Sequence, residues 1–147
     1  MFARIEELRD EGTLSFAVAF SPASLIDSHG IVYAMFSALA QCLLELGAEP
    51  EECEILLDGG LVAPKNFSNQ KTIIRGDDSE PVISMASIVA KVVRDRYMER
   101  IAPEYPQYGF EVHKGYGTLV HRRAISRFGL SGVHRASFCR RLHCLQN

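Results

Sequence analysis

The chain has 147 residues, of which 47% are hydrophobic and 23% are charged, a balance typical of an ordinary globular domain. We therefore expect a single domain over residues 1–147. No apolar run approaches the roughly 20 residues that a membrane-spanning helix needs, and the acidic, amphipathic start does not resemble a signal peptide. The composition thus argues against a membrane protein and favours a cytoplasmic one.

The charge is distributed unevenly along the chain. Residues 1–64 carry 2 basic and 11 acidic side chains, whereas residues 65–147 carry 14 basic and 7 acidic ones. A basic half is consistent with a polyanionic partner such as nucleic acid. Lysines and arginines that only solvate surface helices would give the same counts, so charge alone leaves both interpretations open.

The first part of the chain predicts helices and strands in alternation. Apolar spacing predicts a helix over residues 3–10, and the almost wholly apolar residues 14–20 (LSFAVAF) predict a buried strand. A second helix is expected over residues 30–46, with Asp27 or Ser28 as its cap. Residues 54–59 (EILLDG) predict a second strand.

Residues 72–97 combine a strand, an acidic turn and a long helix. The β-branched residues 72–74 predict the strand, and the turn RGDD ends it. Pro81 fits the first turn of a helix that is free of glycine and proline as far as Pro103. Two short helices are expected further on, over residues 119–128 and 137–142. The order strand, helix, strand, strand, helix predicts an α/β fold with a helical carboxy-terminal part.

Two aspartates, Asp58 and Asp77, follow the second and third predicted strands. If these strands are neighbours, both carboxylates can reach one point at the sheet edge, and hard cations such as Mg²⁺ prefer such oxygen ligands. Aspartate beside glycine is also a common turn residue, so a metal site and an ordinary turn are both open. Asp78 is expected to interact with the helix dipole instead.

The segment HKGYGT, residues 113–118, holds Tyr116 between two glycines whose lack of side chains exposes the ring. Such a ring can stack on a base or a sugar, while Lys114 and neighbouring backbone N–H groups, including that of Gly115, face phosphate. A core tyrosine in a tight loop is the alternative.

Further positive charge is available on the long helix and beyond it. Lys91 and Arg94 are candidates for phosphate binding, or for ordinary ion pairs with neighbouring carboxylates. Four histidines are expected to add conditional positive charge: His113, His121, His134 and His143.

Several of these segments together resemble the type 2 ribonuclease H family, ribonuclease HII. The resemblance rests on GDDSEPVISMASIVAKVVRDRYM, YPQYGFEVHKGYGT, His121 and GLSGVHRASF, with LIDSHGI and ILLDGG fitting the same order. It covers nearly the whole chain, and several motifs in one order are far more specific than a single one. It implies an RNase H-like mixed sheet flanked by helices. It also implies an endonuclease that cuts the RNA strand of RNA–DNA hybrids and single ribonucleotides in DNA.

The resemblance also implies roles for individual residues. In the family, four carboxylates hold two Mg²⁺ or Mn²⁺ ions for two-metal hydrolysis, and Asp58 and Asp77 match the third and fourth. Tyr116 matches the ring that packs against the sugar at the RNA–DNA junction and helps to sense the 2′-hydroxyl. The expected contacts to the nucleic-acid backbone are Lys114, Gly115, Lys91 and Arg94.

The sequence departs from the family at its start. Family members begin with a strand that carries a DEAGRG-like motif, and the Asp-Glu pair at residues 10–11 of this chain lacks that continuation and follows a helical segment. We therefore expect a sheet without its amino-terminal strands, with unpaired edges and too few carboxylates for two ions. The isolated chain is expected to be inactive unless a separate chain supplies the missing strands, and otherwise to be a monomer.

Three functional interpretations follow. The chain is most of a ribonuclease HII, or a non-catalytic nucleic-acid-binding remnant that keeps Tyr116 and the basic surface, or a decayed fragment. The expected partner is an RNA–DNA hybrid or DNA that contains ribonucleotides, and no membrane is expected.

Overall fold

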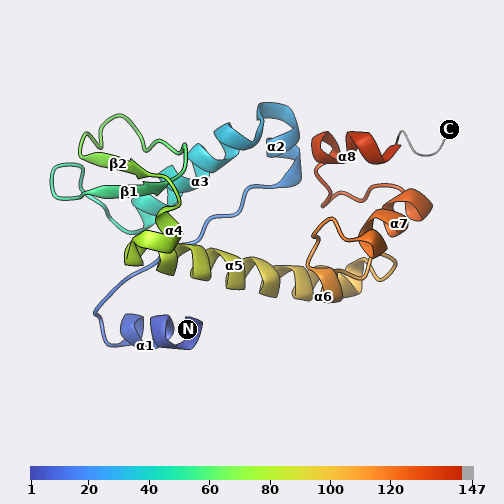
Figure 1. The fold of residues 1–147 in the computed structure, drawn as a ribbon, viewed down its shortest axis with the longest axis horizontal. Coiled ribbons are helices and arrows are strands. Elements are labelled where there is room, and N and C mark those ends of the chain that lie inside the picture. The colour runs from blue at the N-terminus through green and yellow to red at the C-terminus, as the bar shows by residue number, and fades with distance from the viewer. Residues whose placement is uncertain (144–147) are drawn as a thin grey trace. The chain divides into compact units, whose positions relative to one another are not determined.

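The computed structural model describes residues 1–143, with the side chains of residues 141–143, and so that of His143, outside the description. The chain forms two compact units, one of residues 1–21 and 30–92 and the other of residues 22–29 and those from 93 onward. The long helix α5 contributes residues to both (Figure 1). No helix in the described part is long and apolar enough to cross a membrane.

The first unit combines helices with a small parallel sheet. β1 pairs with β2 in parallel, with Ile55 opposite Gln70 and Asp58 opposite Ile73. Leu43 of α3, Leu57 of β1 and Phe67 of the connecting loop are buried together and form its core. Its elements are α1 (Phe2–Asp10), α3 (Ile31–Glu45), β1 (Ile55–Asp58), β2 (Gln70–Ile73), α4 (Gly76–Ser79) and the start of α5 (Pro81–Ile101).

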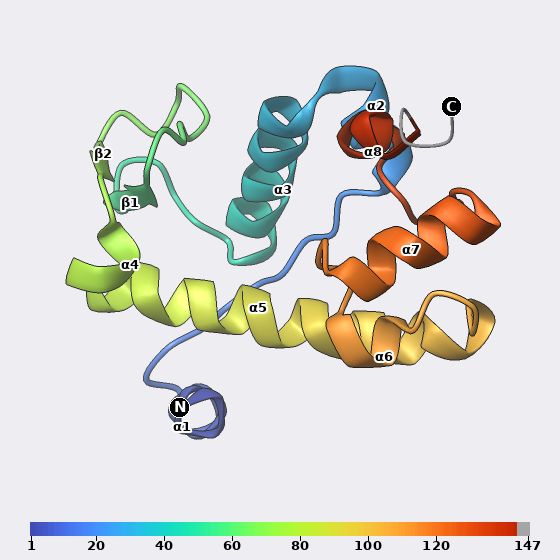
Figure 2. The same cartoon turned by 45° about the vertical axis from the view of Figure 1, so that its right-hand side comes forward.

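Most of the predicted elements of this unit are confirmed, but the predicted strand over residues 14–20 is wrong. These residues have no regular secondary structure, and the sheet of the described chain consists of β1 and β2. A strand exists only where a neighbour pairs with its backbone, and no described segment pairs with this one. Figure 2 shows it as the blue coil that follows α1. Its apolar composition indicated a buried strand, yet Phe20 is 50% exposed.

The second unit is helical, as predicted for the carboxy-terminal part. The prediction of a helix over residues 119–128 is confirmed, and the last predicted helix begins one residue earlier than expected. The sequence did not predict the short helices α2, α4 and α6, because each is too short to show an apolar period. The elements of this unit are α2 (Ala23–His29), the end of α5, the 3₁₀ turn η1 (Ala102–Glu104), α6 (Phe110–His113), α7 (Leu119–Phe128) and α8 (Ala136–His143).

Asp27 does not cap the helix that follows it, contrary to the prediction. It lies within α2, and its carboxylate accepts the backbone N–H groups of Ala136 (2.8 Å) and Ser137 (2.9 Å) at the start of α8. The Ser137 hydroxyl donates to the same carboxylate, and these hydrogen bonds hold the pKa of Asp27 below its ordinary value. The carboxylate thus caps α8 from a distant part of the sequence, and both views show α2 beside α8 (Figures 1 and 2).

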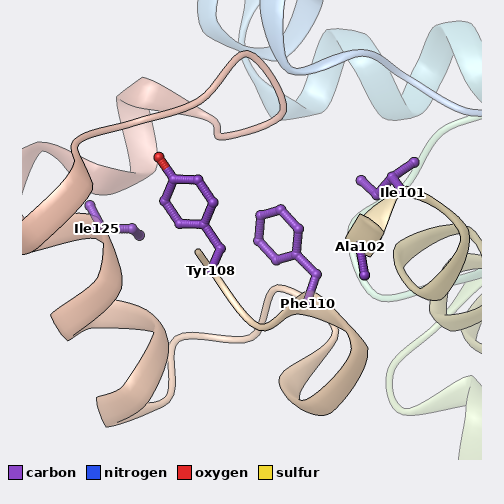
Figure 3. Packing of buried hydrophobic residues seen from close by; sticks show 5 residues of the cluster. All are labelled: Ile101, Ala102, Tyr108, Phe110 and Ile125. Carbon is purple, nitrogen blue, oxygen red and sulfur yellow. The ribbon is translucent and has the colours of Figure 1, made fainter. Parts of the chain in front are cut away.

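Phe110 is the centre of the second unit's core. Its side chain is 1% exposed and belongs to one buried cluster with Ile101, Ala102, Tyr108 and Ile125. Figure 3 shows the Phe110 ring between Tyr108 on one side and Ile101 and Ala102 on the other. The rings of Tyr108 and Phe110 stack with centroids 5.4 Å apart, and the Tyr108 hydroxyl donates to the Gly129 carbonyl at 2.9 Å. One buried ring therefore joins the end of α5, the loop after it and α7.

Phe110→Ala is expected to lower the free energy of unfolding by about 3–5 kcal/mol, because it removes the ring and leaves a cavity in this core. Chemical denaturation followed by circular dichroism measures this. The matched control is Val112→Ala in the same helix, whose side chain is 78% exposed and whose loss should change the free energy by less than about 0.5 kcal/mol. Equal effects of the two variants would show that Phe110 is not at the core.

Candidate functional site

Asp58 stands at the carboxyl end of β1 and is held there by the backbone of α4. Its Oδ1 atom accepts the N–H of Gly76 at 2.9 Å, although 18 residues separate the two in sequence. Asp77 is the next residue of α4. The strand pairing and this hydrogen bond therefore bring the first carboxylate to the residue that precedes the second.

Gly76 allows this close approach because it has no side chain. It is buried, and a Cβ atom at this position would lie 2.5 Å from Cδ1 of Ile83 on α5. Arg75, just before it, has a positive φ of 56°, which turns the chain sharply from β2 into α4. The tight turn aims the Gly76 N–H back toward β1.

The two aspartates of α4 have different surroundings. Arg75 donates from Nε (3.0 Å) and Nη2 (2.6 Å) to Oδ2 of Asp78, which lies in the first turn of the short helix α4 rather than at the start of the long helix. Asp77 is exposed and makes no hydrogen bond or ion pair within the described residues. Of the two, Asp77 is the carboxylate that is available to an added ligand.

The donor set fits a divalent cation only in part. Asp58 and Asp77 offer hard oxygen atoms, and the hydrogen bond from Gly76 occupies one position on Asp58 while leaving its Oδ2 atom for a cation. Among residues 1–143, no group of three or more His, Cys, Asp or Glu side chains is placed to hold a metal ion. Mg²⁺ and Mn²⁺ take about six ligands, so this pair supplies a part of one coordination shell.

A second group of predicted residues lies in the second unit, around the loop of residues 113–118. The Tyr116 ring is 49% exposed, and the guanidinium carbon of Arg94 on α5 lies 4.5 Å from its centroid. The Tyr116 N–H donates to the carbonyl of His113 at 2.8 Å. A cation–π contact on one side and a tight turn beneath it thus hold a ring that remains accessible.

Lys114 and Gly115 both have partners inside the protein. Nζ of Lys114 lies 2.7 Å from Oε1 of Glu99 and donates to the Glu111 carbonyl, and its side chain is 19% exposed. Gly115 has a φ of +75°, its N–H donates to Nδ1 of His113, and a Cβ there would lie 3.1 Å from Cε of Met98. A phosphate would have to replace Glu99 at Lys114, and the role of Gly115 in this structure is to let the loop turn against α5.

Arg94 and Lys91 lie one turn apart on α5, and the unit boundary falls between them. Arg94 is half-buried, and its Nη1 atom lies 3.2 Å from Oδ1 of Asp95. Lys91 is exposed. The structure brings Arg94, Gly115 and Tyr116 together in the second unit. In the first unit it joins Asp58 to Gly76, the residue before Asp77.

Three histidines form a connected group that the sequence interpretation missed. His134 Nδ1 accepts the Ser131 N–H (2.9 Å), the Nε2 atoms of His134 and His121 lie 3.0 Å apart, and His121 Nδ1 lies 2.9 Å from the Tyr116 carbonyl oxygen. His113 stacks on His121 with centroids 4.4 Å apart. In sequence the only signal is that three histidines recur within residues 113–134.

Burial lowers the pKa of both His121 and His134 from the ordinary value; His113 lowers that of His121 further, and His121 lowers that of His134. These shifts favour the neutral form of both rings. The sequence offers these two histidines as sources of conditional positive charge, and burial shifts that charge to a lower pH than for an exposed histidine.

The first unit is an α/β structure with two aspartates at the carboxyl edge of a parallel strand pair, and the second presents an exposed tyrosine. A family model described as Ribonuclease HII matches residues 2–143. The chain belongs to the ribonuclease HII family, as its motifs predicted, and this is a family of enzymes.

Individual relatives agree with this assignment. The chain is similar to the proteins named Ribonuclease HII of Coxiella burnetii (strain Dugway 5J108-111; 42% identical over 124 residues) and of Prochlorococcus marinus (43% over 123 residues). It is also similar to that of Synechococcus sp. (strain WH7803; 43% over 128 residues). These matches cover 84%, 84% and 87% of this chain, but 60%, 63% and 65% of the respective relatives. The chain thus spans less than two thirds of the length of these relatives.

Gly115→Ala is expected to destabilise the second unit by about 1–3 kcal/mol, because alanine disfavours a positive φ and its methyl group would press on Met98. Thermal or chemical denaturation measures the loss. Gly117→Ala in the same loop is the matched control: its φ is not positive and a Cβ there meets nothing within 4 Å, so its effect should stay below about 0.5 kcal/mol. A Gly115→Ala variant as stable as the control would contradict the loop geometry.

Proposed function

We propose that this chain is the part of a ribonuclease HII that supplies two metal-binding carboxylates and the residue that senses a ribonucleotide. Its target is then the RNA strand of RNA–DNA hybrids and single ribonucleotides in DNA. The observation that carries the proposal is the hydrogen bond from Gly76 to Asp58, which holds one carboxylate beside the residue that bears the other. Membership of the ribonuclease HII family is the reason to interpret these two aspartates as metal ligands.

Asp58 and Asp77 would hold Mg²⁺ or Mn²⁺ as part of a two-metal site. A bound divalent cation supplies Lewis acidity at a phosphodiester and activates water for in-line hydrolysis. Asp58 is the oriented ligand, because the Gly76 N–H fixes one of its oxygen atoms. Asp77 is the exposed ligand, free to adjust to the substrate. A four-carboxylate site needs two further carboxylates besides this pair, which a separate polypeptide would supply.

Tyr116 is proposed to pack against the sugar of the ribonucleotide. The half-exposed Tyr116 ring lies against the Arg94 guanidinium, so it offers an apolar face and loses little conformational entropy on binding. Arg94 and Lys91 would contact backbone phosphates, and Lys114 would do so by exchanging Glu99 for phosphate. The 2′-hydroxyl is the group that distinguishes RNA from DNA at such a site.

The non-catalytic binding remnant is the second candidate function. It is supported by the partial donor set, since no group of three or more His, Cys, Asp or Glu side chains among the described residues is placed to hold a metal ion. The two candidates share the nucleic-acid contacts and differ in whether the strand is cut.

The 147-residue chain by itself is expected not to nick a DNA duplex that carries one ribonucleotide, with either Mg²⁺ or Mn²⁺ present. Two carboxylates leave most of the metal ligands to water, so binding is weak and the reacting groups are poorly positioned. A gel assay with a labelled strand measures nicking. Cleavage at the ribonucleotide that Asp58→Asn abolishes and Asp78→Asn preserves would refute this expectation.

Tyr116→Ala is expected to weaken binding to the ribonucleotide-containing duplex by about 5- to 150-fold, which corresponds to the roughly 1–3 kcal/mol of one stacking contact. Fluorescence anisotropy with a labelled duplex measures the affinity. Lys91→Ala is the contrasting variant: it should weaken binding to ribonucleotide-containing and all-DNA duplexes alike and reduce the salt dependence by about one phosphate contact. If the wild type binds both duplexes equally, or if Tyr116→Ala changes nothing, the proposed recognition is wrong.

A further inference from the structure

We propose that His121 and His134 are positioning residues for ribonucleotide recognition. A directed chain of hydrogen bonds through both rings fixes the carbonyl group of Tyr116 and so orients the ring that meets the sugar. This inference rests on the proposed function and adds to it two residues that do not touch the substrate themselves.

The two ends of the hydrogen-bond chain determine where its protons lie. At one end the Ser131 N–H can only donate, so His134 Nδ1 accepts and the proton of that ring is on Nε2. At the other end the Tyr116 carbonyl can only accept, so His121 carries its proton on Nδ1. His121 Nε2 is then the acceptor for the N–H of His134 at 3.0 Å. The Ser131 hydroxyl lies 2.7 Å from the same Nδ1 atom of His134 and can donate to it as well. This arrangement, with both rings neutral, gives each contact in the chain a donor and an acceptor.

The neighbouring residues hold the two rings in place. His113 stacks on His121, and its own Nδ1 accepts the Gly115 N–H while its Nε2 lies 2.7 Å from the Tyr108 carbonyl oxygen. Phe110 meets the His121 ring edge-on, with centroids 5.5 Å apart. His121 and His113 thus bind the backbones of adjacent loop residues, 116 and 115. The loop is therefore fixed by side chains rather than by regular secondary structure.

The titratable and charged groups around the pair favour the neutral state. His113 from α6 faces His121, and Tyr108, whose ring centroid lies 4.8 Å from that of His134, faces the second ring. Arg135 is next to His134 in sequence, but its guanidinium lies over Phe138 at 4.2 Å from the ring centroid. Burial is the largest cause of the lowered pKa of both His121 and His134. A proton added to either ring would turn one accepting nitrogen into a donor and break the chain.

The sign of the pH effect follows from these lowered pKa values. Below the ordinary histidine pKa of 6.5, the unfolded chain binds more protons than the folded one, so the contribution of the two rings falls as the pH decreases. The contribution of the two neutral rings to the stability of the fold is complete above pH 6.5. It is lost as the pH falls toward the lower pKa values of the folded state. Preference for a ribonucleotide should decline over the same acidic range.

The test compares affinities for a duplex with one ribonucleotide and for the same duplex in DNA alone. His121→Leu keeps the approximate size of the side chain but removes both of its hydrogen bonds. It should reduce the preference for the ribonucleotide-containing duplex about fivefold or more, toward the preference of Tyr116→Ala. The affinity for the all-DNA duplex should change less than about twofold. His121→Asn keeps an N–H donor near the Nδ1 position and should retain most of the preference. His29→Leu, an exposed histidine in α2, is the matched control and should behave as wild type.

Equal losses on both duplexes, or a preference that survives His121→Leu, would overturn the positioning role while leaving the proposed function intact. No preference in the wild type would overturn the proposed function, and this role with it. Nitrogen-15 NMR of the unaltered chain at about pH 7.5 gives a readout that does not depend on any variant folding. The expected tautomers are Nδ1–H for His121 and Nε2–H for His134, and the opposite tautomer or a charged ring at either position would overturn the inference.

Discussion

The need of each backbone N–H and C=O group for a partner governs both units of this protein. At several places where secondary structure does not provide the partner, a side chain does. Asp58 accepts the N–H of Gly76 at the start of α4, Asp27 accepts two N–H groups at the start of α8, and His121 donates to the carbonyl of Tyr116. Residues 14–20, which have no partner strand in the described chain, stay irregular despite their apolar composition.

The same interactions place the candidate functional groups. Asp58 is both a structural acceptor and a proposed metal ligand, and these roles are compatible because a carboxylate offers several lone pairs and one N–H occupies one of them. Asp77 is left exposed, while its neighbour Asp78 pairs with Arg75. An oriented ligand beside an exposed one is suited to a site where a cation and a substrate phosphate arrive together.

The loop that carries Tyr116 shows how charge is distributed in the second unit. Lys114 is paired with Glu99, and Arg94 lies over the Tyr116 ring, so neither cation is simply exposed to solvent. Burial lowers the pKa of His121 and His134 and so favours their neutral forms. The positive charge that the sequence shows in this half is therefore partly used inside the fold, and the exposed part of the site is an aromatic face rather than a strongly charged surface.

The sequence by itself determined the family, the two strands before Asp58 and Asp77, and the long helix from Pro81, because local propensities and ordered motifs carry that information. Only the tertiary structure decided the rest. Strand formation over residues 14–20 depends on a partner, the target of the Asp27 cap lies more than a hundred residues away, and the protonation of His121 depends on burial. Each of these depends on how the chain packs in three dimensions, which a local pattern of residues does not specify.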